Sequence, residues 1–156
     1  MTINITTLTK KVNTNNYYKE MVNPHKMKAQ YNPKRFHLWK SLHRGPEKEV
    51  LNMLYSPHYR FLKNRKDGSY YQLQRFFGRN DRWIQDKINQ FLSIFESIKK
   101  NGFLENVSVV DNPLVKNPYN SGLEIFEGHH RIACALVLGL KLIPCEIIRR
   151  NFDGKR

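Results

Sequence analysis

Long apolar runs are missing from this sequence of 156 residues. No stretch of about 18 consecutive apolar residues is present, so no segment is suited to cross a bilayer as a helix. The first residues, MTINITTLTKKVNTNN, contain no apolar segment of the kind that a secretory signal has. We therefore expect a protein with no membrane partner that resides in the cytoplasm.

Cysteine is also scarce, with only Cys134 and Cys145 in the chain. A structural zinc site needs four Cys or His ligands at close spacing, and neither cysteine belongs to such a set. Each cysteine falls in an apolar stretch, so we expect both to be buried as small hydrophobic residues. A disulfide between them is unexpected in a reducing compartment.

Acidic residues are few: 13 Asp and Glu stand against 27 Lys and Arg, which gives a formal net charge of +14. The excess is greatest in residues 1–45, where the only acid is Glu20. Such a field attracts polyanions, including nucleic acid, nucleotides, anionic lipid and acidic glycans. Net charge selects no particular partner, and a solvated basic face is an equally good interpretation.

The spacing of apolar residues after residue 35 predicts one small α/β domain. Helical pieces are expected within 36–55, divided by Gly45-Pro46, then at 81–100 and 129–138. Strands are expected at 107–110, 123–126 and 142–148. Residues 56–80 are expected to be irregular, with 70–77 either a short helix or an ordered loop. The predicted organisation is a basic polar extension (1–35), the domain (36–150) and a basic tail (151–156).

The segment Glu127-Gly128-His129-His130-Arg131 carries the strongest chemical signal, because it joins a predicted strand to a predicted helix. The first backbone N–H groups of a helix have no internal partners, and the helix dipole favours anions there. A glycine allows a sharp turn and close approach of a ligand. The imidazoles and the guanidinium can donate to phosphate oxygens, and Glu127 can bind Mg²⁺ or accept a proton. An alternative interpretation is that Glu127 caps the helix or pairs with Arg131.

The segment EGHHRIACALVLGLKLIPCEII resembles the signature of the ParB/sulfiredoxin-like superfamily. Two earlier segments also resemble this family, SIKKNGFLENVSVV (97–110) and, more loosely, SPHYRFL (56–62), so the resemblance covers roughly residues 50–148. It implies an α+β fold with a small mixed sheet and packed helices. The positions that carry the signature are Gly128, His129, His130, Arg131, Ala133, Ala135, Gly139, Ile143 and Pro144.

The resemblance implies a nucleotide, ATP, ADP or CTP, usually with Mg²⁺, bound at this turn. Sulfiredoxin-like members carry a reactive cysteine where this chain has His129, so reduction of cysteine sulfinate is not expected. ParB partition proteins continue into a helix-turn-helix domain, and this chain ends eight residues after Ile148, so a partition clamp is not expected. A third branch, similar to free-serine kinases, transfers a phosphoryl group to a small hydroxyl substrate and is compatible with this turn.

We therefore expect a phosphotransferase or nucleotide hydrolase with Glu127 and His130 as catalytic residues. Phosphate-binding residues are expected to be Gly128, His129, His130 and Arg131, joined by His58 and Arg60, and Glu127 is the expected metal ligand. Arg60 is equally well interpreted as a surface charge, and His58 as a turn residue.

Two alternatives remain at this point. One is a protein that binds nucleic acid or acts as a nuclease, with Tyr70, Tyr71, Phe76 and Phe77 stacking beside Arg75 and Arg79. Aromatic residues at this density are also typical of a core. The other alternative is a regulator that senses a nucleotide without turning it over.

Overall fold

The computed structural model describes residues 17–111 and 123–149 of the chain. The helices are α2 (Pro33–Leu42), α3 (Pro57–Lys63), α4 (Ser69–Phe76), α5 (Asp81–Asn101) and α6 (His129–Leu138), with single 3₁₀ turns at Pro24–Lys26, Glu47–Glu49 and Met53–Tyr55. The strands are β1 (Tyr17–Val22), β2 (Met27–Lys28), β3 (Val107–Asp111), β4 (Leu123–Glu127) and β5 (Ile143–Arg149).

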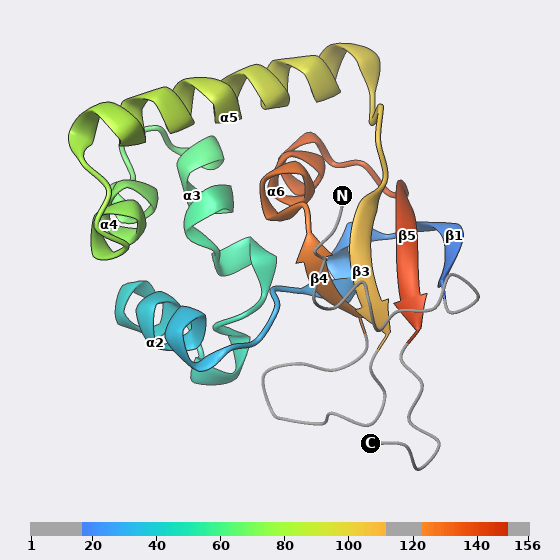
Figure 1. The fold of residues 1–156 in the computed structure, drawn as a ribbon, viewed down its shortest axis with the longest axis horizontal. Coiled ribbons are helices and arrows are strands. Elements are labelled where there is room, and N and C mark those ends of the chain that lie inside the picture. Colours follow the sequence, from blue (N-terminus) through green and yellow to red (C-terminus); the bar gives the residue numbers. More distant parts are fainter. Residues whose placement is uncertain (1–16, 112–122, 150–156) are drawn as a thin grey trace.

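The strands form one sheet in the order β1-β5-β3-β4-β2. Strand β3 is parallel to β5 and antiparallel to β4, while β1 is antiparallel to β5 and β2 is parallel to β4. Figure 1 shows this sheet on the right, α2, α3 and α4 on the left, and α6 between them. The prediction of an α+β domain with a small mixed sheet and packed helices is therefore confirmed.

Helix α6 lies at the centre of the hydrophobic core. Its residues from Ile132 to Leu136 are all buried, and α3 and α5 both contact this helix. Alanine and cysteine dominate the buried stretch, and such short side chains let the helix approach its neighbours closely. Cys134 and Cys145 are buried and free, as expected. Burial raises the pKa of the Cys134 thiol to about 12 and that of Cys145 to about 11.

The proposed boundary between an extension and the domain at residues 35 and 36 is not where the structure places it. Residues 17–22 pair with β5 and residues 27–28 pair with β4, so both segments belong to the sheet. Strand β1 is an edge strand, and most of its residues are exposed. Its sequence, YYKEMV, lacks the alternation of apolar and polar residues that marks a half-buried strand, so it resembled part of an extension. Residues 1–16 and 151–156 lie outside the described residues.

Residues 56–80 contain two helices where we expected irregular chain. Helix α3 begins with Ser56 as N-cap, whose side chain accepts a hydrogen bond from the Tyr59 N–H, followed by Pro57 in the first turn. Both residues are standard helix-start signals. The undecided stretch at 70–77 is mostly α4. The second helical piece expected before residue 56 is instead a pair of 3₁₀ turns.

Among the described helices, none combines the length and apolar character needed to cross a membrane.

Candidate functional site

The turn between β4 and α6 depends on Gly128. Its backbone has a φ of +115°, a conformation that side chains disfavour, and a Cβ built there would lie 2.8 Å from Val107 Cγ1. The chain therefore reverses closely against β3 before α6 begins. Gly128, at the N-cap position, has no side chain that could cap α6, so among the described residues the first backbone N–H groups of the helix have no capping side chain.

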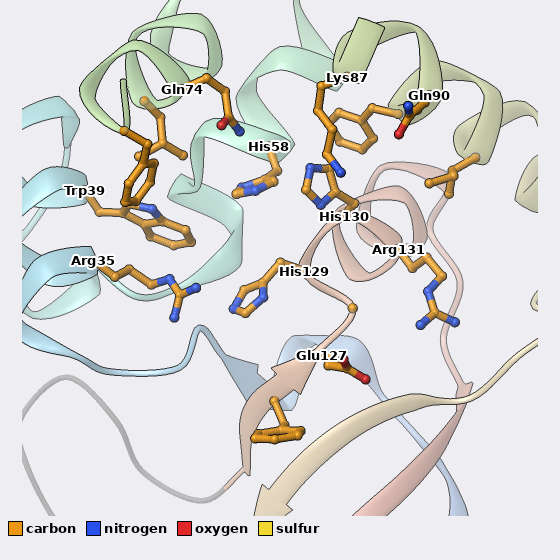
Figure 2. A pocket seen from close by; sticks show the side chains of 16 residues that line it. Arg35, Trp39, His58, Gln74, Lys87, Gln90, Glu127, His129, His130 and Arg131 are labelled. Carbon is orange, nitrogen blue, oxygen red and sulfur yellow. The ribbon is translucent and has the colours of Figure 1, made fainter. Parts of the chain in front are cut away.

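A cavity of about 470 Å³ opens at this helix start. That volume is within the usual range for small-molecule sites, and elements far apart in the sequence contribute to the walls. Figure 2 shows α2, α3, α4 and α5 facing the turn across this space. The labelled lining residues are Arg35, Trp39, His58, Gln74, Lys87, Gln90, Glu127, His129, His130 and Arg131.

Positive charge dominates the cavity walls. Arg35, Lys87 and Arg131 line the cavity, against a single carboxylate, Glu127. The Arg35 guanidinium donates to the Gln30 carbonyl oxygen at 2.9 Å, and its burial lowers its pKa. A cavity with this balance attracts anions, because opposing charges inside it are few.

Arg131 is held at the edge of the cavity by the loop before β3. Its guanidinium donates to the carbonyl oxygens of Glu105 and Asn106 at 3.3 and 3.2 Å and lies 3.7 Å from the Glu105 carboxylate. Glu105 is largely exposed, so this ion pair contributes little stability. The carbonyl contacts orient the guanidinium and leave its other donors for a ligand.

Three imidazoles meet on the inner wall. The ring centroids of His58 and His130 are 4.6 Å apart and nearly perpendicular, and those of His58 and His129 are 6.3 Å apart. The Tyr70 hydroxyl lies 2.8 Å from His130 Nε2, and the Gln30 N–H donates weakly to His129 Nε2 at 3.5 Å. These contacts orient His129 and His130 at the start of α6.

All three histidines are held in the neutral form at pH 7. Burial lowers the pKa of His58 and of His129 well below the usual value for histidine, and nearby positive groups add to the effect. Burial, reinforced by Lys87, lowers the pKa of His130 to about 4. A neutral imidazole offers one N–H donor and one acceptor, so this wall is polar but uncharged.

His58 has an unsatisfied nitrogen. Its Nδ1 atom is buried and has no hydrogen-bond partner among the described residues. The ring packs edge-on against Tyr70 and Phe91, with centroid distances of 5.3 and 6.2 Å. A buried polar atom without a partner is costly, and a purely structural position would favour an apolar ring.

Glu127 stands apart from the other acids. It is exposed at the end of β4, and no group of three or more potential metal-ligating side chains occurs within residues 17–111 and 123–149. Mg²⁺ commonly binds one or two carboxylates together with phosphates of the ligand. Within the described residues Glu127 has no partner ligands for a metal, so Mg²⁺ would need oxygen ligands from a bound phosphate.

The structure brings six of the seven predicted site residues to this cavity and places the seventh, Arg60, elsewhere. Glu127, Gly128, His129, His130, Arg131 and His58 all line it.

Arg60 does not line the cavity. Its guanidinium lies 3.1 Å from Asp67 Oδ2 and donates to the Leu42 carbonyl oxygen at 2.7 Å. It therefore ties the end of α2 to the loop before α4. It is mostly buried, so it is not a surface charge either.

Arg35 and Lys87 are the cavity cations that the sequence interpretation missed, and both carried a usable signal. Lys87 lies three residues after Ile84 and four before Phe91, so it falls within the buried stripe of α5. Arg35 precedes the buried Trp39 by one turn of α2. A cation on the apolar face of a helix is unusual and suggests a polar cavity beneath it.

No family model matches this sequence, and no curated protein matches it either. Two solved structures are similar in fold. A sulfiredoxin from Arabidopsis thaliana is 15% identical over 85% of this chain and 86% of its own, with a TM-score of 0.39. The C-terminally truncated chromosome-partitioning protein ParB from Caulobacter crescentus, complexed with CTP-γ-S, is 16% identical over 88% of this chain and 46% of its own, also with a TM-score of 0.39. At such identities and TM-scores the likeness to these two proteins concerns the fold alone.

Proposed function

We propose that this cavity binds a nucleotide, such as ATP, ADP or CTP, through its phosphates. The observation that carries the proposal is the start of α6, which has a glycine as its N-cap and opens into a cavity that, among the described residues, is lined by three Lys or Arg side chains and one carboxylate. Free backbone N–H groups at a helix start bind anionic oxygens directly. Cationic side chains around them add charge-assisted hydrogen bonds.

Each part of the cavity has a role in this proposal. The backbone N–H groups after Gly128, together with Lys87 and Arg131, bind phosphate oxygens. The neutral imidazoles of His129 and His130 donate further hydrogen bonds without adding charge. Trp39 and Phe77 line the same cavity and offer apolar ring surfaces for the nucleotide base.

The reaction that suits this arrangement best is phosphoryl transfer to a small hydroxyl-bearing substrate. Such transfer depends mainly on positioning and on neutralising charge. The hydroxyl oxygen attacks the terminal phosphorus, its proton passes to Glu127, and the bond to the nucleoside diphosphate breaks. His130, oriented by Tyr70, donates to the transferred group. With water as the nucleophile, the same residues catalyse hydrolysis.

Mg²⁺ accompanying the nucleotide supplies charge neutralisation when bound. Glu127 is the single carboxylate that lines the cavity, so it serves either as a metal ligand or as the base.

The binding step is tested by titrating the protein with ATP, ADP, CTP and pyrophosphate, with and without Mg²⁺, by calorimetry. Lys87→Ala should weaken binding by about 10-fold or more, since a hydrogen bond to a charged group contributes roughly 1.5–3 kcal/mol. Lys100→Ala is the matched control, because Lys100 lies on the same helix and does not line the cavity. Equal affinity of both variants, or no binding by the unmodified protein, would refute the proposal.

Turnover is tested separately. Glu127→Gln should lower the rate of nucleotide consumption by about 100-fold while binding is retained. Glu96→Gln, an exposed acid on α5, is the control. Binding without turnover in the unmodified protein would leave a nucleotide sensor as the function.

A further inference from the structure

Large aromatic rings are exposed where α4 meets α5. Phe76 is 54% exposed, and Phe77 and Trp83 are each 38% exposed. Tyr70, which we also considered for stacking, is fully buried in the core and is not available. Rings on a protein surface cost hydrophobic free energy, and these three lie within eight consecutive positions, so the α4–α5 turn is a candidate interaction surface.

Cations accompany two of these rings. Lys34 Nζ lies 5.0 Å from the centroid of the Phe77 ring, and the Arg79 guanidinium lies 4.6 Å from that of Trp83. Arg82, next to Trp83, is also exposed. Lys34 comes from α2, Arg82 from α5 and Arg79 from the turn, so the fold brings together cations that lie apart in the sequence.

One nearby acid is neutralised internally. Asp81 pairs with Arg75 at 2.7 Å and accepts a short hydrogen bond from the Tyr71 hydroxyl. This pairing leaves Lys34, Arg79 and Arg82 as the main charges that an incoming ligand meets, with Asp86 the next acid along α5. The surface at the α4–α5 turn thus combines apolar rings with net positive charge.

We propose that this surface binds single-stranded nucleic acid, with bases stacking on Phe76 and Trp83 and phosphates contacting the neighbouring cations. Rings interleaved with basic side chains are the usual means of binding single strands without sequence preference. A duplex keeps its bases stacked inside and offers only phosphates to the cations. An acidic peptide would use the cations and leave the rings without a partner.

This second site does not depend on nucleotide binding in the cavity. Phe77 contributes to both the cavity wall and the surface, so it is unsuitable for separating them. Phe76, Arg79 and Trp83 do not line the cavity and can be changed alone.

Trp83 provides a natural reporter. The chain has two tryptophans, and Trp39 is only 4% exposed, so a ligand that stacks at the surface acts mainly on Trp83 fluorescence. Titration of the full chain with an unlabelled oligothymidine or an unlabelled oligouridine should quench the fluorescence of Trp83. Trp83→Phe should abolish the signal while binding, followed by anisotropy of a labelled oligonucleotide, persists.

The oligonucleotide affinity of single variants identifies which side chains contact the ligand. Trp83→Ala and Phe76→Ala should each weaken oligonucleotide binding by about 10-fold, since one base–ring stack accounts for roughly that factor. Leu104→Ala removes an equally prominent exposed apolar side chain elsewhere and should change nothing. Lys87→Ala should retain oligonucleotide binding, which separates this site from the cavity.

Three other polyanions test whether the surface is selective for single-stranded nucleic acid. Heparin of matched charge should bind without quenching Trp83, and duplex DNA should bind more weakly than the single strand at the same salt concentration. Equal binding of single strand and heparin with unchanged fluorescence would overturn the proposal. Quenching by vesicles of anionic phospholipid, with none by oligonucleotides, would overturn it in favour of a lipid surface.

Discussion

Replacing His58 by phenylalanine should make the protein more stable and at the same time weaken its response to nucleotide. His58 lines the cavity from α3, yet its Nδ1 atom is buried without a hydrogen-bond partner among the described residues. A histidine kept in such a position costs stability in the free protein. We infer that the imidazole is there for the ligand and not for packing.

The magnitude follows from the contacts of the ring. An unsatisfied buried polar atom costs about 1–3 kcal/mol. Phenylalanine keeps a planar ring, so the edge-on contacts with Tyr70 and Phe91 and the tilted contact with Trp39 are retained. The slightly larger ring offsets part of the gain. We expect the free energy of unfolding of His58→Phe to rise by about 1–2 kcal/mol, which raises Tm by roughly 2–8 °C.

The assay is thermal unfolding with and without saturating nucleotide, supported by urea titration. The unmodified protein should show a ligand-induced rise in Tm, and His58→Phe should start higher and show a smaller rise. His43→Phe is the control, because His43 Nδ1 is also buried without a partner in the described structure but His43 does not line the cavity. A His58→Phe variant that is destabilised and still responds to nucleotide would show that the imidazole serves packing alone.

Two further predictions concern the histidine wall and the turn. Because the pKa of folded His130 is lowered to about 4 from an unfolded value near 6.5, the unfolded chain binds more protons between these values, and stability should fall as the pH drops. Urea unfolding at pH 7 and pH 5 should differ by about 2 kcal/mol from His130 alone, and a flat profile would refute the assigned burial. Gly128→Ala should lower the free energy of unfolding by about 2–4 kcal/mol, because a Cβ there would lie 2.8 Å from Val107 Cγ1 at a positive φ. Gly139→Ala, at a positive φ with open space around it, should cost only about 1 kcal/mol in the same titration, and similar losses would argue against the close approach.

The elements that were predicted correctly are those whose own residues specify them. Helix α5 has an apolar repeat, an Asn80 cap and a terminal Gly102, and it begins and ends within one residue of the expected bounds. The turn at Gly128 was recognisable because a glycine separates an apolar strand from an apolar helix. Local signals of this kind are independent of the rest of the chain, so sequence alone predicts the side of the cavity that α6 forms.

The opposite side of the cavity could not be predicted in the same way. Strand β1 has no strict alternation of apolar and polar residues in its sequence, and its hydrogen-bond partners lie in β5, more than 120 residues later in the chain. Arg35 lies near the start of α2, yet the fold places it at the same cavity as His129. Arg60 was expected at the site because its segment resembles one in a known family, but Asp67 and the Leu42 carbonyl oxygen hold it elsewhere. Strand pairing and helix packing decide the first two placements, and Arg60 is fixed by contacts with the two segments on either side of α3.

The neutral form of the histidines explains how one cavity can hold so many donors without charge repulsion among them. Were His58, His129 and His130 charged, they would repel one another and Lys87 across a few ångströms in a medium of low dielectric constant. Burial keeps them neutral, so the permanent positive charge of the free cavity is confined to its Arg and Lys side chains. A neutral imidazole can still donate one hydrogen bond to an anionic oxygen, so the proposed phosphate site gains donors from this wall without gaining charge.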